Sequence, residues 1–242
     1  MQAVLWGKDH LELGEITSRA VGPRTAVAIT RGRHRKAYPY TDPNEDAAIA
    51  VVGPRATLLA VADGHNGWPA TEAVISTVVA ALGVDPPPAD VPDDAVVDLF
   101  HRASQAVLDV TARPGAINPD SRTTLVVALV AGRRLQWASF GDSAVYTVSQ
   151  AAATALARPQ HMFVGYPMPR RAVDWGLERG TTELTEGEWV VVATDGFVDF
   201  ARPFPTQLFA AGADAAGVAE GLVEAACHGG AGDNVAVAVV GP

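Results

Sequence analysis

Apolar residues in this chain occur in short runs that are rich in valine and alanine and are separated by polar and turn-forming residues. Several runs are apolar throughout, which is typical of strands that are buried on both faces. Glycine and proline mark their ends, as at Gly53, Pro54 and Gly132, where the chain can reverse. The pattern predicts strands over residues 25–30, 47–52, 57–62, 123–130, 135–140, 144–148, 189–194 and 235–240.

Three longer segments show the three- and four-residue spacing of apolar positions that is typical of an amphipathic helix. The first ends at Gly83, as expected for a helix that stops at a glycine. In the second, Leu99, Phe100, Ala103 and Val107 fall on one side, and we expect that side to face the core. The segments cover residues 70–82, 93–110 and 214–226.

The predicted strands come in neighbouring pairs, and the helices lie between groups of strands. This order favours antiparallel sheets with helices outside over repeated strand–helix–strand units. Residues 158–180, which include Pro159, Pro167 and Pro169, separate two groups of strands and show no regular period. A loop of this length inside a compact domain is often a lid or a binding flap, and we expect one here.

Composition narrows the class of protein. The chain has 242 residues, of which 48% are hydrophobic, and this is enough for one large domain with a sizeable core. Its formal charge of −9 argues against nucleic-acid binding, which favours broad basic patches. No apolar run approaches the about 18–20 residues that a membrane span needs, so we expect no membrane association. The first residues lack the pattern of a signal peptide, and the single Cys227 excludes an intrachain disulfide. Both features fit a cytoplasmic location.

Acidic residues recur where predicted strands begin or end. They are far apart in the sequence, so only the fold can bring them together. A cluster of oxygen ligands suits hard divalent cations such as Mg²⁺ or Mn²⁺. Metal-assisted hydrolysis is therefore the first hypothesis. The sites are Asn44-Glu45-Asp46, Asp63-Gly64-His65-Asn66-Gly67, Gly141-Asp142-Ser143, Thr194-Asp195-Gly196 and Asp233-Asn234.

Taken together, these motifs resemble those of the type-2C family of metal-dependent serine/threonine protein phosphatases. The strongest is Val61-Ala62-Asp63-Gly64-His65-Asn66-Gly67, which is similar to the family's Asp-Gly-His-Gly-Gly signature. Thr123-Thr124-Leu125 and the other acidic motifs follow in the family's order, so the resemblance runs from about residue 25 to residue 240. It implies an α+β fold, a four-layer sandwich in which two central antiparallel sheets are flanked by helices. A single phosphatase-like domain would then cover residues 23–242, and residues 1–22 have no assigned role.

The resemblance also implies a set of metal ligands for two Mn²⁺ or Mg²⁺ ions. Asp63 would bridge the two ions, and Gly64 would contribute its carbonyl oxygen. Asp195 and Asp233 would complete the first ion. Glu45 or Asp46 would serve the second, directly or through water, and the sequence does not choose between them. Asp142 matches a position that bacterial members use for a third, weaker metal.

In this chemistry a water held between the two ions loses a proton and attacks phosphorus. His65 has two interpretations. It is either a histidine in a turn that donates a hydrogen bond to the site, or the general acid that protonates the leaving serine or threonine oxygen. The resemblance favours the general acid.

Two arginines of the family are missing. The arginine that grips the substrate phosphate is replaced by Thr41, and the Gly-Asp-Ser element continues with Ala144 instead of arginine. Threonine cannot offer the bidentate fork of a guanidinium. The basic cluster Arg31, Arg33, Arg35 and Lys36 has two interpretations, a solvated loop or a site that steers anions. The arginines Arg31, Arg33 and Arg35 are our candidates for binding substrate phosphate.

The leading hypothesis is an enzyme that dephosphorylates phosphoserine and phosphothreonine in proteins. Its partners would be phosphorylated protein substrates and a cognate protein kinase. Two alternatives stay open: a catalytically weak or silent phosphatase-like interaction protein, and a hydrolase of small phosphate esters. The retained carboxylates argue against the silent protein, and the missing arginines keep the small-ester hydrolase in view.

Overall fold

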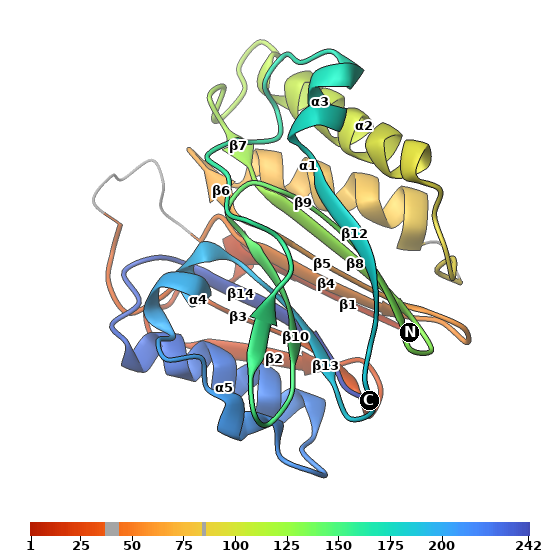
Figure 1. Ribbon diagram of the computed structural model, residues 1–242. Helices are drawn as coiled ribbons and strands as arrows, with labels where there is room; N and C mark the ends of the chain where they lie inside the picture. The colour runs from red at the N-terminus through yellow and green to blue at the C-terminus, as the bar shows by residue number, and fades with distance from the viewer. Residues whose placement is uncertain (37–43, 84–85) are drawn as a thin grey trace.

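The computed structural model describes residues 1–36, 44–83 and 86–242. Two antiparallel β-sheets are stacked face to face, and helices cover the outer face of each (Figure 1). The architecture is therefore the predicted α+β sandwich of four layers. Among the described residues, no helix is both long and apolar enough to cross a membrane.

The first sheet contains six strands in the order β1-β4-β5-β8-β9-β12, and all neighbours are antiparallel. Its central strands consist almost entirely of buried apolar residues, because they are covered on both faces. The strands are β1 (Gln2–Trp6), β4 (Ala47–Val52), β5 (Thr57–Ala62), β8 (Leu125–Ala131), β9 (Arg134–Phe140) and β12 (Glu178–Glu183).

The second sheet also contains six strands, in the order β11-β10-β13-β14-β3-β2. Every residue of β3 and of β14 is buried. The strands are β2 (Ile16–Ala20), β3 (Thr25–Thr30), β10 (Ala144–Val148), β11 (Ala153–Ala155), β13 (Trp189–Ala193) and β14 (Val235–Val240). A separate two-stranded ribbon pairs β6 (Gly64–His65) with β7 (Arg122–Thr123).

Three apolar clusters hold the layers together. Small branched side chains from both sheets, such as Val61, Val126 and Val192, fill the space between the sheets. Helices α1 (Pro69–Val78) and α2 (Asp93–Thr111) cover the first sheet. A π-helical turn over Val79–Gly83 extends α1, and α3 (Arg170–Gly176) packs beside α2. The second sheet is covered by α4 (Asp195–Phe200) and α5 (Ala215–His228). Short 3₁₀ turns occur at Gly7–Asp9, after β1, and at Thr206–Phe209, between α4 and α5.

The structure confirms the eight predicted strands and the three predicted helices, with small shifts at their ends. The largest shift is at residues 123–130, where Thr123 belongs to β7 and β8 begins at Leu125. The predicted inner side of the second helix is also confirmed, because Leu99, Phe100, Ala103 and Val107 are all buried.

Two segments have more structure than the sequence predicted. Residues 1–22, which had no assigned role, supply β1 at the edge of one sheet and β2 at the edge of the other. The expected loop over residues 158–180 contains α3 and the start of β12. Both β2 and β12 are rich in polar residues, as is common for edge strands, so they lack an apolar period. Thr41 lies outside the described residues.

Candidate metal centre

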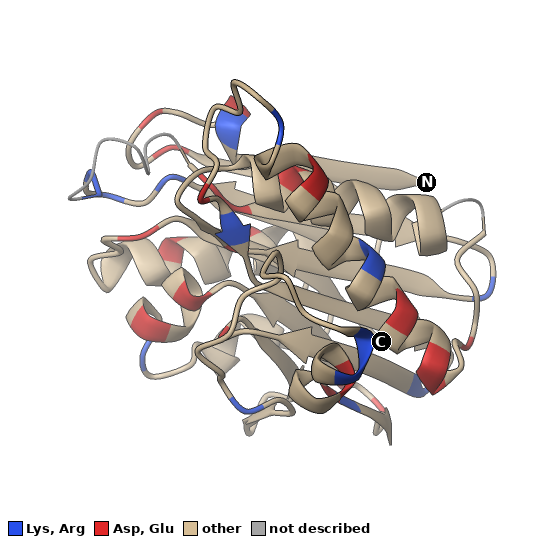
Figure 2. Ribbon diagram, turned by 90° about the horizontal axis from the view of Figure 1, so that it is seen from above, with Lys and Arg blue, Asp and Glu red and all other residues tan. Residues whose placement is uncertain are grey.

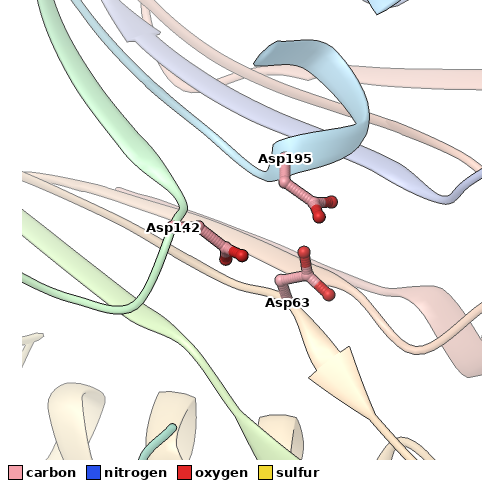
Figure 3. Close-up of side chains that lie close together, drawn as sticks. All are labelled: Asp63, Asp142 and Asp195. Carbon is pink, nitrogen blue, oxygen red and sulfur yellow. The ribbon is translucent and has the colours of Figure 1, made fainter. Parts of the chain in front are cut away.

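Three aspartates from distant parts of the chain converge at one end of the sandwich. Asp63 follows β5, Asp142 lies in the turn between β9 and β10, and Asp195 begins α4. One carboxylate oxygen from each lies within 4.8 Å of the others, and the three side chains point toward one another (Figure 3). This is the group of possible metal ligands that the described part of the chain brings together.

The pairing of the strands explains why these residues meet. Ala47 of β4 is opposite Ala62 of β5, so Asp46 and Asp63 lie at the same end of adjacent strands. In the second sheet Ala193 of β13 is opposite Val237 of β14, which puts the residues after β13 beside those before β14. Carboxylates at the ends of antiparallel strands therefore share one edge of the sandwich.

A cavity of about 310 Å³ opens over this group of aspartates. It contains most of the predicted site residues from both sheets, so Asp63 and Asp233 face the same space. Among the predicted metal ligands Asp46 is the exception: it is buried outside the cavity wall, and its Oδ2 accepts a hydrogen bond of 2.7 Å from Thr194 Oγ1. The lining residues are Lys36, Glu45, Asp63, Gly64, His65, Asp142, Phe163, Asp195, Gly232 and Asp233.

The backbone of Asp63 is held by the two threonines of the Thr123-Thr124-Leu125 motif. Thr123 Oγ1 donates to the Asp63 carbonyl oxygen at 2.8 Å, and the Thr124 amide donates to the same oxygen at 2.9 Å. Asp63 N donates to Thr124 Oγ1 at 3.0 Å, and that hydroxyl is also 2.7 Å from Ser143 Oγ. Thr123 and Thr124 therefore fix the backbone from which the Asp63 carboxylate extends.

Asn234 links the acidic segment before β4 to the end of the second sheet. Its Oδ1 accepts a hydrogen bond of 2.9 Å from the Glu45 amide, and its Nδ2 donates to the Arg31 carbonyl oxygen at 3.0 Å. The sequence alone indicated no role for Thr194 or Asn234. Each stands directly beside a predicted ligand, Asp195 and Asp233 respectively, and this adjacency was the available signal.

Two glycines are required by close packing at the site. A Cβ on Gly64 would lie 2.6 Å from the Glu45 carbonyl oxygen, and a Cβ on Gly196 would lie 2.0 Å from the Asn234 carbonyl oxygen. Side chains at these positions would push the acidic segments apart. Each glycine thus keeps two acidic segments at the end of its own sheet close together, Asp63-Gly64 beside Glu45 and Asp195-Gly196 beside Asp233-Asn234.

Burial and mutual repulsion raise the pKa values of the clustered carboxyl groups. The pKa of Asp63 is raised well above its ordinary value by burial and by the nearby carboxylates of Asp195 and Asp46. Burial is also the main cause of the raised pKa values of Asp46, Glu45, Asp195 and Asp142. Figure 2 shows the contrast with the rest of the fold, where charged positions lie mainly on helices and loops and the strands are largely free of them. Among the described residues, Glu45 and Asp46 are the only fully buried charged ones.

The site fits a divalent cation. Among the described residues that line the cavity, Asp195 has a buried Oδ1 without a hydrogen-bond partner. Buried carboxylate oxygens that lack a donor are costly unless a cation satisfies them. All the clustered ligands are hard oxygens, which suit Mg²⁺ or Mn²⁺ better than softer metals.

One basic residue enters the cavity, and it is a lysine rather than one of the predicted arginines. Lys36 Nζ lies 2.9 Å from Glu45 Oε2 and 2.6 Å from Asp233 Oδ1. Burial disfavours its charge, but the carboxylates of Asp233 and Glu45 outweigh that effect and raise the pKa of Lys36. Of the described residues, Lys36 is the only Lys or Arg that lines the cavity.

The structure does not bring Arg31, Arg33 and Arg35 to the cavity, which corrects the sequence-based expectation. The Arg31 guanidinium donates to the Leu11 carbonyl oxygen, and Arg33 and Arg35 are exposed. The Arg33 amide donates to the Ala231 carbonyl oxygen at 2.9 Å, which anchors this part of the chain against the loop before β14. Anchored in this way, the chain turns Lys36 inward.

His65 lies at the rim of the cavity, where it is exposed to solvent. Its ring stacks on Phe163, with the ring centroids 4.9 Å apart and the planes inclined by 17°. Phe163 belongs to the segment between β11 and α3. This contact joins the Asp63-Gly64-His65 signature to the segment that the sequence identified as a binding flap.

A two-sheet sandwich with clustered carboxylates at one end is the architecture of metal-dependent protein phosphatases of the 2C type. The chain belongs to the protein phosphatase 2C family, whose profile matches residues 34–224. The chain is thus a member of a family of serine/threonine protein phosphatases.

Solved structures of phosphatases share the fold. A bacterial serine phosphatase is 15% identical with a TM-score of 0.77, covering 90% of this chain and 97% of its own. The phosphatase PstP/Ppp of Mycobacterium tuberculosis is 23% identical with a TM-score of 0.69, covering 90% of this chain and 97% of its own. The catalytic domain of PstP in complex with 2 manganese ions is 23% identical with a TM-score of 0.67, covering 94% of this chain and 99% of its own. No curated protein matches the sequence.

Proposed function

We propose that this protein hydrolyses phosphoserine and phosphothreonine in proteins, with Mn²⁺ or Mg²⁺ as its cofactor. The observation that carries the proposal is the convergence of Asp63, Asp142 and Asp195 within 4.8 Å in a cavity that also contains Glu45 and Asp233. These residues come from the ends of both sheets, and membership of the protein phosphatase 2C family supports phosphate-ester hydrolysis as their chemistry. A protein kinase that phosphorylates the same substrates is the partner that this activity implies, and the single Cys227 suits the cytoplasm.

The cavity suggests how the ligands divide between two ions. Asp63 would bridge the ions, Asp195 and Asp233 would complete the first, and the Gly64 carbonyl oxygen and Glu45 would serve the second. Glu45 is favoured over Asp46 as the ligand that faces the cavity, because Asp46 is outside the wall and bonded to Thr194. Asp142 would serve a third ion beside Asp63 and Asp195. Bound divalent ions would lower the pKa of water to produce a nucleophile and would offset the charge on phosphoryl oxygens.

The protein's own residues position this chemistry. Thr123 and Thr124 fix the backbone at Asp63, and Asn234 fixes Glu45 relative to the opposite sheet. His65 stands at the rim, where a phosphorylated side chain entering from solvent would place its leaving oxygen. There the imidazolium can donate a proton to that oxygen as the bond to phosphorus breaks. Stacking on Phe163 limits the rotation of the ring.

The test is release of phosphate from a phosphothreonine peptide by the purified protein. We expect turnover with Mn²⁺ and its loss when EDTA replaces the metal. Parallel reactions with a phosphoserine peptide and p-nitrophenyl phosphate separate the candidate functions. Hydrolysis of p-nitrophenyl phosphate alone would favour the small-ester hydrolase, and no hydrolysis of any substrate with Mn²⁺ would contradict an enzymatic role.

Replacing His65 with glutamine should lower turnover of the phosphothreonine peptide by about 10²-fold, the usual contribution of a general acid. Turnover of p-nitrophenyl phosphate should change little, because its leaving group is stable without a proton. The ratio of kcat for the two substrates is the measurement. Equal losses on both would remove the general-acid assignment and leave His65 as a structural donor at the rim.

A further inference from the structure

The chain uses lysine sparingly: of its 18 Lys and Arg residues only Lys8 and Lys36 are lysines. Lys36 is nevertheless the basic residue that lines the acidic cavity in the described part of the chain. Lysine and arginine differ in a way that matters here. An ammonium is a compact point charge with three donors, whereas a guanidinium is a planar fork. A compact cation among carboxylates is the closest that a side chain comes to a bound metal ion.

Lys36 contacts two of the five carboxylate residues that line the cavity. Its Nζ contacts Glu45 Oε2 at 2.9 Å and Asp233 Oδ1 at 2.6 Å, and its side chain is only 16% exposed. The other carboxylates, from Asp63, Asp142 and Asp195, converge on one another beside it. Lys36 therefore occupies the oxygens of Glu45 and Asp233 and leaves the aspartate group without a side-chain cation.

We propose that Lys36 is a built-in cation that competes with a divalent ion for Glu45 and Asp233. An ion held by Asp63, Asp142 and Asp195, without Asp233, can bind while Lys36 stays in place. An ion that uses Glu45 or Asp233 must first displace the ammonium, so ions at these two sets of ligands differ in affinity. This inference rests on the proposed metal site, and it adds that Lys36 limits the binding of metal ions to that site.

Charge and space prevent Glu45 from holding Lys36 and a divalent ion together. Glu45 is 2% exposed in its side chain and takes a further hydrogen bond from the Gly67 amide, so it has little freedom to serve two cations at once. The Lys36 ammonium and a divalent ion bound to the same carboxylate would repel each other strongly in a partly buried site. Because Lys36 must be displaced, the apparent affinity for the ion equals the intrinsic affinity multiplied by the fraction of molecules in which Lys36 has already left the site.

The test is calorimetric titration of the metal-free protein with Mn²⁺, using Lys36→Met and the matched control Lys8→Met. Methionine keeps the length of the side chain and removes its charge. Lys8 is paired with Glu72 and lies over the Trp68 ring, away from the cavity. We expect Lys36→Met to bind its weaker Mn²⁺ ion at least about tenfold more tightly than wild type, as for release of a competing state that is about 90% populated. Lys8→Met should match wild type.

A second measurement uses the wild-type protein and does not depend on whether a variant folds. An amine-reactive reagent followed by peptide mass spectrometry reports each lysine separately, and Lys8 serves as the internal control. We expect Lys36 to be protected in EDTA, where it is held by two carboxylates, and to be labelled at least about fivefold more in saturating Mn²⁺, as its shielded population falls. Labelling of Lys8 should not change.

Each outcome decides the matter. If Mn²⁺ binds equally to wild type and Lys36→Met, and Lys36 stays protected in Mn²⁺, the competition is refuted while the proposed phosphatase stands. If Lys36→Met raises KM for phosphopeptide with unchanged Mn²⁺ binding, Lys36 contacts substrate phosphate and the inference is also refuted. If neither the wild type nor either variant binds Mn²⁺, the proposed metal site itself is refuted.

Discussion

Replacing Asp63 with asparagine should abolish measurable phosphate release, with a loss of about 10³-fold or more that corresponds to about 4 kcal/mol of transition-state stabilisation. In the proposed site both ions would share the Asp63 carboxylate, which has an oxygen within 4.8 Å of oxygens of Asp142 and Asp195. An amide of the same shape keeps the packing but loses the charge that a divalent cation requires. Initial rates on the phosphothreonine peptide with Mn²⁺ are the measurement.

The same variant should behave in the opposite way in a thermal melt without metal. Burial and the carboxylates of Asp195 and Asp46 make a charged Asp63 unfavourable, so the asparagine variant should melt at the same or a higher temperature than wild type in EDTA. Mn²⁺ should then raise its melting temperature far less than that of wild type. Loss of activity combined with a more stable metal-free protein would separate a chemical role from misfolding.

Asp199→Asn is the matched control for this experiment. Asp199 lies four residues after Asp195 in the same motif, is exposed and pairs with Arg202 at 2.9 Å. It does not line the cavity. We expect nearly wild-type activity and an unchanged response to Mn²⁺. Equal activity of the Asp63 and Asp199 variants would overturn the assignment of Asp63.

The metal-free protein should lose stability as the pH rises, and Mn²⁺ should reverse this trend. Asp63, Asp46, Glu45 and Asp195 all have folded-state pKa values raised above the ordinary 3.8 of aspartate and 4.5 of glutamate. In the window above those ordinary values the folded state holds more protons than the unfolded state. The free energy of unfolding therefore falls with rising pH until the raised pKa values have been passed.

A divalent cation changes the sign because it binds the deprotonated carboxylates of the folded state. Stability with Mn²⁺ should rise with pH over the same window, as more sites become available to the ion. Urea denaturation from pH about 5 to about 8, in EDTA and in Mn²⁺, measures both slopes. The Asp63→Asn variant should show a shallower slope in EDTA. Parallel slopes with and without metal would contradict a cation site among these carboxylates.

Much of the fold could be predicted because its central strands need no information from their neighbours. Every residue of β4, β13 and β14 is apolar, and so is every residue of β5 except Thr57; a short run of this kind is typical of a strand covered on both faces. The edge strands could not be predicted in the same way. Residues 178–183 contain two glutamates, an arginine and two threonines, and they are a strand because β9 offers them an open ladder.

The candidate site could also be predicted only in part. The sequence identified the carboxylates, because Asp63-Gly64 and Asp195-Gly196 are local patterns at strand ends. It could not choose between Glu45 and Asp46, because adjacent residues of an extended chain point to opposite sides. The structure turns Glu45 to the cavity and Asp46 to Thr194.

The sequence by itself determined which segments form the central strands, which acidic residues are candidates for the site, and the resemblance to the family. Only the tertiary structure decided which residue of the basic cluster enters the cavity, since four of them follow one another within six positions and share the same charge. Hydrogen bonds from the Arg33 amide to Ala231 and from the Arg31 guanidinium to Leu11 set the course of this segment. These contacts join parts of the chain that are distant in sequence, so no local pattern of residues could encode them.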